Sequence, residues 1–204
     1  MTEIDLLMNQ LQSREANLLD YHTYPKYAVL LPLIKKENEW FIVFEVRSSH
    51  LKHQPGEICF PGGKVEEDDP TFEFAAKRET SEELGISMDT IEKIVPLDYF
   101  VTPYGKMIFP FAGIIKEGTP FFENEEVEEL FLVPLNYLKN YSVKEHTIHL
   151  KVEVEEDFPY EKIAGGTKYQ WQKRSSKEYF YHYENKTIWG LTARILHHFL
   201  ELAK

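Results

Sequence analysis

The chain has 204 residues and is acidic, with 23 Lys and Arg against 34 Asp and Glu, a formal net charge of −11 and a pI of about 5.2. This length suits one domain with a substantial core, and the negative charge argues against a basic surface for long nucleic acid. The lone cysteine, Cys59, excludes an intramolecular disulfide, and no apolar run is long enough to cross a membrane.

The N-terminal segment has a helical pattern. Residues 4–19 carry apolar side chains close to the helical period, so we expect residues 1–22 to form a helix that packs on the domain. The start lacks the charged-then-apolar layout of a signal peptide, and the last three residues differ from a peroxisomal address of the S-K-L type. We therefore expect a cytoplasmic protein.

The remaining chain alternates between strand-like and helical patterns. We expect strands at residues 27–34, 40–46, 91–101, 107–115, 127–133, 146–154 and 179–183. We expect helices at residues 70–84, in a short turn after Pro134, and at residues 186–203, where Asn185 or Thr187 starts the last one. With no repeat or linker, this order predicts a single α+β domain over residues 1–204, with a mixed sheet between helices.

The helix expected at residues 70–84 gathers three carboxylates. Asp69 suits its N-cap, Pro70 its first position and Gly85 its C-terminal stop. Residues three and four apart share one face of a helix, so the side chains of Glu79, Glu82 and Glu83 are expected on one patch. Three close anions repel each other unless a cation lies among them. Oxygen ligands favour a hard divalent ion, Mg²⁺ or Mn²⁺.

A solvated acidic face is the simpler interpretation of a Glu-rich helix. Four features together favour a metal site instead: the Arg78-Glu79 pair, the carboxylate spacing, the two helix boundaries and the Gly62-Gly63 loop before the helix. A glycine lets its carbonyl approach a metal or phosphate with no side chain in the way.

Residues 63–86 resemble the Nudix box, G-x5-E-x7-R-E-U-x-E-E-x-G-U, in which U is aliphatic. The matching positions are Gly63, Arg78, Glu79, Glu82, Glu83, Gly85 and Ile86. Asp69 stands where the box has its first Glu, eight residues rather than seven separate it from Arg78, and Thr80 occupies an aliphatic position. The extra residue in the spacing concerns the role of Asp69 and leaves the carboxylate cluster intact.

The flanks resemble the coenzyme A diphosphatase subfamily. The upstream segment, residues 47–63, reads RSSHLKHQPGEICFPGG and is similar to that subfamily's signature. Three downstream segments are also similar: residues 102–113, 125–135 and 188–196. Some subfamily members have a histidine where this chain has Gln54, so Gln54 receives no catalytic role. The likeness extends from about Tyr27 onward and sharpens the expected fold to an α/β/α sandwich.

The resemblance implies a metal-dependent hydrolase that cuts coenzyme A, or its thioesters, into 4'-phosphopantetheine and 3',5'-ADP. Glu79 and Glu83 are the expected metal ligands, with Glu82 as a ligand or water-orienting group and the Gly63 carbonyl as a further ligand. Arg78 is expected to orient the acids rather than to contact substrate. The sequence leaves the general base open between Glu82 and an acidic cluster, Glu123, Glu125 and Glu126. The alternative interpretation of this cluster is a solvated loop, and within it we favour Glu126.

Substrate contacts are expected from three cations, each of which is more often an ordinary surface residue: Arg47, Lys52 and Lys64. Residues 155–177 form an insertion that either covers the site or builds a homodimer contact. Two other functions stay open: a Nudix hydrolase of ADP-ribose, NADH or another nucleotide, and a non-catalytic nucleotide-binding module. The expected partner in each case is a small nucleotide, with neither a nucleic-acid polymer nor a membrane.

Overall fold

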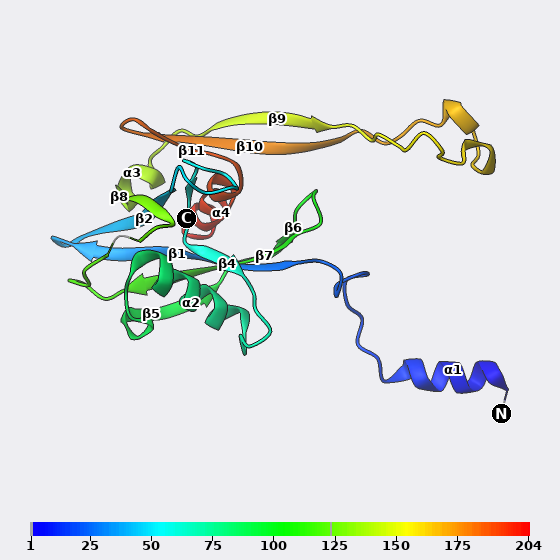
Figure 1. Ribbon diagram of the computed structural model, residues 1–204, viewed down its shortest axis with the longest axis horizontal. Coiled ribbons are helices and arrows are strands. Elements are labelled where there is room, and N and C mark those ends of the chain that lie inside the picture. Colours follow the sequence, from blue (N-terminus) through cyan, green and yellow to red (C-terminus); the bar gives the residue numbers. More distant parts are fainter. Residues whose placement is uncertain (1, 123) are drawn as a thin grey trace.

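A computed structural model of the chain describes residues 2–122 and 124–204 and has an eight-stranded mixed sheet at its centre (Figure 1). The strands of this sheet are β1 (Lys26–Lys36), β2 (Glu39–Arg47), β3 (Ile58–Cys59), β4 (Gly62–Lys64), β5 (Ile91–Pro96), β6 (Phe100–Val101), β7 (Met107–Ile115) and β8 (Val127–Pro134). β1 runs parallel to β7, and the other pairs among the described strands are antiparallel.

Two helices cover the two faces of this sheet. α2 (Phe72–Leu84) lies on one face and α4 (Gly190–Leu202) on the other (Figure 1). Successive side chains of a strand point to opposite faces, so Leu30 of β1 packs in the core beneath α2 and Leu31 in the core beneath α4. A strand that is buried on both faces needs apolar residues at consecutive positions, which β1 has. The expected α+β sandwich with a mixed sheet between helices is confirmed.

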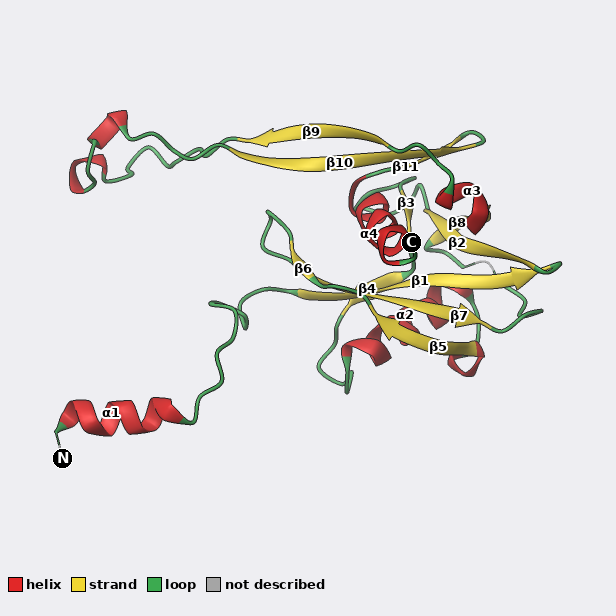
Figure 2. Cartoon of the chain, turned by 180° about the vertical axis from the view of Figure 1, so that it is seen from behind, coloured by secondary structure: helices red, strands yellow, loops and turns green. Residues whose placement is uncertain are grey.

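A second sheet, in the order β11-β10-β9, adjoins α4. It comprises β9 (Lys144–Leu150), β10 (Arg174–Tyr183) and β11 (Lys186–Ile188), and the short helix α3 (Leu135–Lys139) precedes it after Pro134 as predicted. Residues 151–173, which join β9 to β10, extend far from the rest of the molecule (Figures 1 and 2). We call these residues the arm. In this structure the arm does not cover the α2 face.

The predicted N-terminal packing helix over residues 1–22 is wrong in extent and in packing. α1 (Glu3–Gln12) ends well before Leu19, has no buried residue and projects away from the sheet in both views (Figures 1 and 2). A capping box at Thr2 and Asp5 explains why this segment is helical without tertiary contacts.

Three other predicted boundaries also need correction. The last helix was expected over residues 186–203, but residues 186–188 pair with β10 as β11, so α4 begins at Gly190. The strand expected at residues 91–101 is split, because Pro96 has no N–H to continue the ladder, and β6 forms separately. β9 ends at Leu150 rather than at residue 154.

Within the described residues, no helix combines the length and the apolar character that a bilayer crossing requires.

Candidate active site

The N-terminus of α2 differs from the prediction. Thr71, not Asp69, is the N-cap, and its side-chain oxygen accepts a hydrogen bond from the Phe74 N–H at 3.0 Å. Pro70 therefore lies before the helix. Asp69 accepts instead from the Glu66 N–H at 2.8 Å and from the Arg78 guanidinium at 2.9 and 3.0 Å.

The other end of α2 follows the prediction. Gly85 has a φ of 62°, the left-handed conformation that ends helices, and a Cβ there would come within 2.7 Å of Phe122. Ala75 and Ala76 are fully buried, and small side chains at these positions let α2 lie close to the sheet. The helix axis is thereby fixed against β1 and β4, which it contacts.

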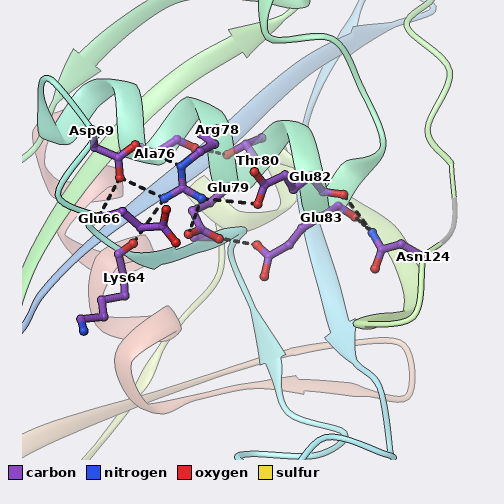
Figure 3. Close-up of polar contacts among 11 residues, drawn as sticks. Lys64, Glu66, Asp69, Ala76, Arg78, Glu79, Thr80, Glu82, Glu83 and Asn124 are labelled. Carbon is purple, nitrogen blue, oxygen red and sulfur yellow. Dashed lines mark hydrogen bonds and ion pairs between the residues drawn. The ribbon is translucent and has the colours of Figure 1, made fainter.

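The carboxylates of α2 meet the glycine loop at β4. A Cβ on Gly63 would lie only 2.3 Å from the carboxyl carbon of Glu79, so no other residue fits without moving that side chain. Glu83 is buried and its Oε2 accepts from the Gly62 N–H at 2.7 Å. Glu82 is the outermost, with a side chain 59% exposed (Figure 3).

Arg78 lies among the acids rather than away from them. It donates to Oε1 of Glu79 at 2.8 Å and to Oε2 of Glu82 at 3.4 Å, besides its contacts with Asp69 (Figure 3). Its Nη2 also donates to the Lys64 carbonyl at 3.3 Å. These hydrogen bonds hold the pKa of the Asp69 carboxyl below its usual range and raise that of Arg78. Arg78 is thus permanently charged and orients the acidic side chains.

Strand β2 adds two groups to this face, one of which sequence analysis missed. Glu45 is 1% exposed, accepts a hydrogen bond from Cys59 Sγ at 3.0 Å and lies close enough to Glu83 to interact electrostatically. Arg47, a predicted substrate contact, lowers the pKa of both carboxyls. The signal for Glu45 was a single charge inside the apolar run at residues 40–46, a pattern that indicates a functional or paired group.

The loop before β8 brings Glu126 to the same place. Asn124 donates to the carbonyls of Glu82 and Glu83 at 3.1 and 2.6 Å, and its Oδ1 accepts from the N–H groups of Glu126 and Val127 at 2.9 and 3.1 Å (Figure 3). The loop is thereby tied to the C-terminus of α2. Glu126 is exposed, yet near enough to raise the pKa of Glu79.

The other predicted site residues lie apart from this cluster. Glu125 is exposed, and Glu123 lies outside the described residues. Lys52 is exposed in the loop before β3, and the Lys64 amine points away from the carboxylates (Figure 3). Of the three expected substrate cations, only Arg47 faces the acids in this structure.

Burial dominates the electrostatics of the cluster. It raises the pKa of Glu83, with repulsion from Glu45 adding to it, and raises the pKa of Glu79 against the opposing effect of Arg78. The same cause raises the pKa of Glu45. The acids near α2 thus outnumber the two arginines, Arg47 and Arg78, and burial favours the protonated form of these carboxyls in the absence of a cation.

A hard divalent cation fits this donor set. Carboxylate and carbonyl oxygens are the ligands that such ions prefer, and the Oε2 atom of Glu45 is buried with no hydrogen-bond partner. Within residues 2–122 and 124–204, no three Asp, Glu, His or Cys side chains already converge as a ligand set. The reason is visible in the contacts: Arg78 and the Gly62 N–H hold the carboxylates of Glu79 and Glu83.

A cavity of about 250 Å³ lies away from these acids. Its lining comes from the segment around β6, from β7 and from α4, namely Asp98, Tyr99, Phe100, Pro110, Arg194, Ile195 and His198. It contains no carboxylate of α2, so we place the candidate chemistry at α2 and not there.

Comparisons with known proteins identify a family model and similar sequences. The family model described as the NUDIX domain matches residues 24–151. The chain is 33% identical over 156 residues to the peroxisomal coenzyme A diphosphatase NUDT7 of Mus musculus, an alignment that covers 74% of this chain and 66% of the mouse protein. The chain therefore spans slightly less than two thirds of that relative.

Two further comparisons extend the range of similar proteins. The chain is 29% identical over 177 residues to an uncharacterized Nudix hydrolase NudL of Yersinia pestis (strain Pestoides F), covering 86% of this chain and 78% of that one. A solved structure, the NUDIX domain of Shewanella oneidensis NrtR complexed with ADP ribose, aligns with a TM-score of 0.47 at 16% identity over 68% of this chain and 86% of that one.

Proposed function

This chain belongs to the NUDIX domain family, and we propose that it is a Nudix hydrolase that cleaves coenzyme A or its thioesters at the central diphosphate. The products would be 4'-phosphopantetheine and 3',5'-ADP. One observation carries the proposal: the segment that resembles the coenzyme A diphosphatase signature, residues 47–63, runs from Arg47 on the acidic face to the glycine that packs on Glu79. The name of the mouse relative supports the same substrate.

We propose Mg²⁺ or Mn²⁺ as the cofactor. Glu79, Glu83 and the Gly63 carbonyl would hold it, with Glu82 as a further ligand or water-orienting group. When bound, such an ion neutralises the diphosphate and lowers the pKa of a water molecule for attack.

The chain's own residues would then position the reacting groups and deprotonate the attacking water. Hydrolysis breaks one P–O bond of the diphosphate, adds a water oxygen to one phosphorus and leaves the bridging oxygen on the other product. A carboxylate must accept the proton that the water loses, and Glu126 or Glu82 is our candidate for this base. Arg78 holds Glu79 and Glu82 in place through its hydrogen bonds. Arg47 is our candidate to bind a substrate phosphate.

Two alternatives stay open. The first is a Nudix hydrolase of ADP-ribose, NADH or another nucleotide, since the box is shared between these activities. The second is a nucleotide-binding module without turnover. The presence of Glu79, Glu82 and Glu83 together argues against the second, because a module that no longer hydrolyses is expected to lose a carboxylate of the box.

Product analysis separates the three functions. Purified full-length protein would meet coenzyme A, ADP-ribose, NADH and a nucleoside triphosphate in parallel, with Mg²⁺, Mn²⁺ or a chelator, and chromatography with mass spectrometry would identify the products. Metal-dependent release of 4'-phosphopantetheine at the highest kcat/KM supports our proposal. Cleavage of ADP-ribose or NADH with coenzyme A intact rejects the substrate. Nucleotide affinity without any cleavage favours the binding module.

We further propose a homodimer and a cytoplasmic location. The exposed apolar side chains of α1 and the projecting arm support the first, because contiguous exposed apolar surface is typical of association sites. Light scattering should give the mass of a dimer, and a monomer at tens of micromolar would reject it. Fluorescence of a tagged chain in its own cell tests the location.

A further inference from the structure

Glu45 faces α2 because of the alternation along β2. Ile42 and Phe44 belong to the core beneath α4, whereas Val43 between them belongs to the core beneath α2. Successive side chains of a strand point to opposite faces, so Glu45 shares the face of Val43. The strand therefore directs this carboxyl toward the helix that carries Glu79 and Glu83.

One oxygen of Glu45 is held and the other is free. Oε1 accepts a hydrogen bond from Cys59 Sγ at 3.0 Å, across the β2–β3 pair in which these residues lie opposite each other. Oε2 is buried and has no hydrogen-bond partner. A buried acceptor without a partner typically costs about 1–3 kcal/mol, and more when it is charged, so such an atom in a native fold needs an explanation.

The surroundings of this oxygen are predominantly acidic. Glu83, Glu79 and Glu126 each repel Glu45 electrostatically, and Arg47 attracts it. The Nε atom of Arg47 is also buried without a partner, and the free oxygen of Glu45 accepts no hydrogen bond from this arginine. A cation beside Glu83 would both give Oε2 of Glu45 a partner and offset the repulsion between Glu45 and the neighbouring carboxylates.

We propose that Glu45 is a further carboxylate of the divalent-cation site, outside the helix that supplies the other acids, and that Cys59 fixes its orientation. The ion would then have carboxylates around it from two elements, β2 and α2. This would fix its position relative to the sheet as well as to the helix. Cys59 acts here as a hydrogen-bond donor, and burial raises the pKa of its thiol, so it keeps the proton that it donates. This inference rests on the proposed function only for the presence of the cation.

Manganese binding to the full chain tests the inference without reference to turnover. The Kd for Mn²⁺ would be measured by electron paramagnetic resonance of the free ion, together with the rise in Tm at saturating Mn²⁺. Glu45→Gln keeps the shape and removes the charge, and Glu92→Gln removes the same charge from an exposed position on β5 of the same sheet. Losing a carboxylate that supports a metal typically weakens affinity by about 10- to 100-fold.

We expect Glu45→Gln to bind Mn²⁺ about tenfold more weakly than the wild type, and Glu92→Gln to bind it as the wild type does. Without metal, the Tm of Glu45→Gln should equal or exceed that of the wild type, because a repelling charge has gone. A folded Glu45→Gln protein with wild-type Mn²⁺ affinity overturns the inference and leaves Glu45 as a buried neutral acid.

A second variant serves if Glu45→Gln does not fold. Glu45→Asp keeps the charge but withdraws the carboxylate by one methylene, so it should also bind Mn²⁺ more weakly, and wild-type affinity would count against the inference. The outcome is separable from that of the substrate assay. Wild-type protein that binds Mn²⁺ but leaves coenzyme A intact rejects the substrate and not Glu45.

Discussion

We call the eight-stranded sheet with α2 and α4 the body. Helix α4 of the body and the projecting N-terminal helix α1 are opposite cases. α4 buries Ala193, Ile195, Leu196 and Leu200, whereas α1 has apolar side chains at helical spacing and buries none of them. α1 nevertheless has the better N-terminal cap, since no side chain caps α4. The comparison teaches that local signals decide whether a segment is helical, while contacts with the sheet decide whether the helix contributes to the stability of the fold.

The arm shows the same distinction between local contacts and packing on the sheet, here with aromatic residues. Phe158, Tyr160, Tyr169 and Trp171 form edge-to-face pairs with ring centroids 5.0–5.8 Å apart near its tip. These rings pack on each other, and the segment that carries them extends away from the eight-stranded sheet (Figure 2). We propose that the chemistry of the molecule belongs to the body, and four predictions test this division.

The largest expected effect is on turnover. Glu83→Gln should lower kcat by at least ~1000-fold, about 4 kcal/mol of barrier, because it removes a charged ligand of the proposed metal. The fold should survive, since the glutamine oxygen can still accept from the Gly62 N–H. Activity assays with circular dichroism check this result.

Glu153→Gln, the same change at an exposed position of the arm, is the matched control and should retain wild-type kcat. Metal-dependent turnover at the wild-type rate in Glu83→Gln would remove Glu83 from the proposed ligand set. Loss of activity in Glu153→Gln would instead show that the arm takes part in the reaction.

The next effect compares two leucines in helices. Leu196→Ala in α4, where the side chain is fully buried, should lower the free energy of unfolding by about 3 kcal/mol. Leu7→Ala in α1, where the side chain is 48% exposed, should change it by less than about 0.5 kcal/mol. Urea denaturation of both variants gives the comparison, and equal losses would mean that α1 is packed in solution.

A smaller effect is expected at the loop that carries Glu126. Asn124→Ala removes two donated and two accepted hydrogen bonds at the end of α2, so the free energy of unfolding should fall by about 1–2 kcal/mol. If Glu126 is the base, kcat should fall as well. Asn17→Ala removes an acceptor from the exposed segment after α1 and should change neither quantity. Unchanged stability in Asn124→Ala would mean that this tie is not formed in solution.

The smallest expected effect is a dependence of the free energy of unfolding on pH, caused by His197. Burial lowers the pKa of His197 below its ordinary value of 6.5, and the ring stacks on Tyr179 with centroids 3.9 Å apart and bonds Tyr181 at 2.9 Å. The charged groups that act on the ring are Glu201, Lys204, Glu145 and Lys177. Above pH 6.5 both folded and unfolded chains carry the neutral ring, so His197 adds no pH dependence there.

As the pH falls below 6.5, the unfolded chain takes up the proton first and the free energy of unfolding decreases. Glu45 and Glu83 act in the opposite direction, because their raised pKa values favour the folded chain as the pH falls. The Tm of the wild type relative to that of His197→Phe should therefore fall between pH 7 and 5. His149→Phe on β9, at an exposed position, is the control and should leave the slope unchanged. An equal slope in the wild type and His197→Phe would assign the pH dependence to other groups.

Much of the site could be predicted because its spacing is local. The i, i+3 and i+4 positions of Glu79, Glu82 and Glu83 and the stop at Gly85 depend only on the geometry of one helix. The start of that helix was misplaced because Asp69, a good N-cap by type, is taken by Arg78, which lies nine positions later in the chain. Thr71 remained to cap the helix.

The sequence by itself determined the family, the acidic helix and the order of most strands, since each follows from short-range patterns of apolar, charged and glycine residues. Only the tertiary structure decided that Glu45 and Glu126 lie beside that helix, that Lys64 points away from it, and that α1 and the arm leave the body. These placements depend on pairings between distant segments, such as β2 with β8 and Asn124 with the end of α2. A local sequence pattern does not specify which distant segment will pair with it.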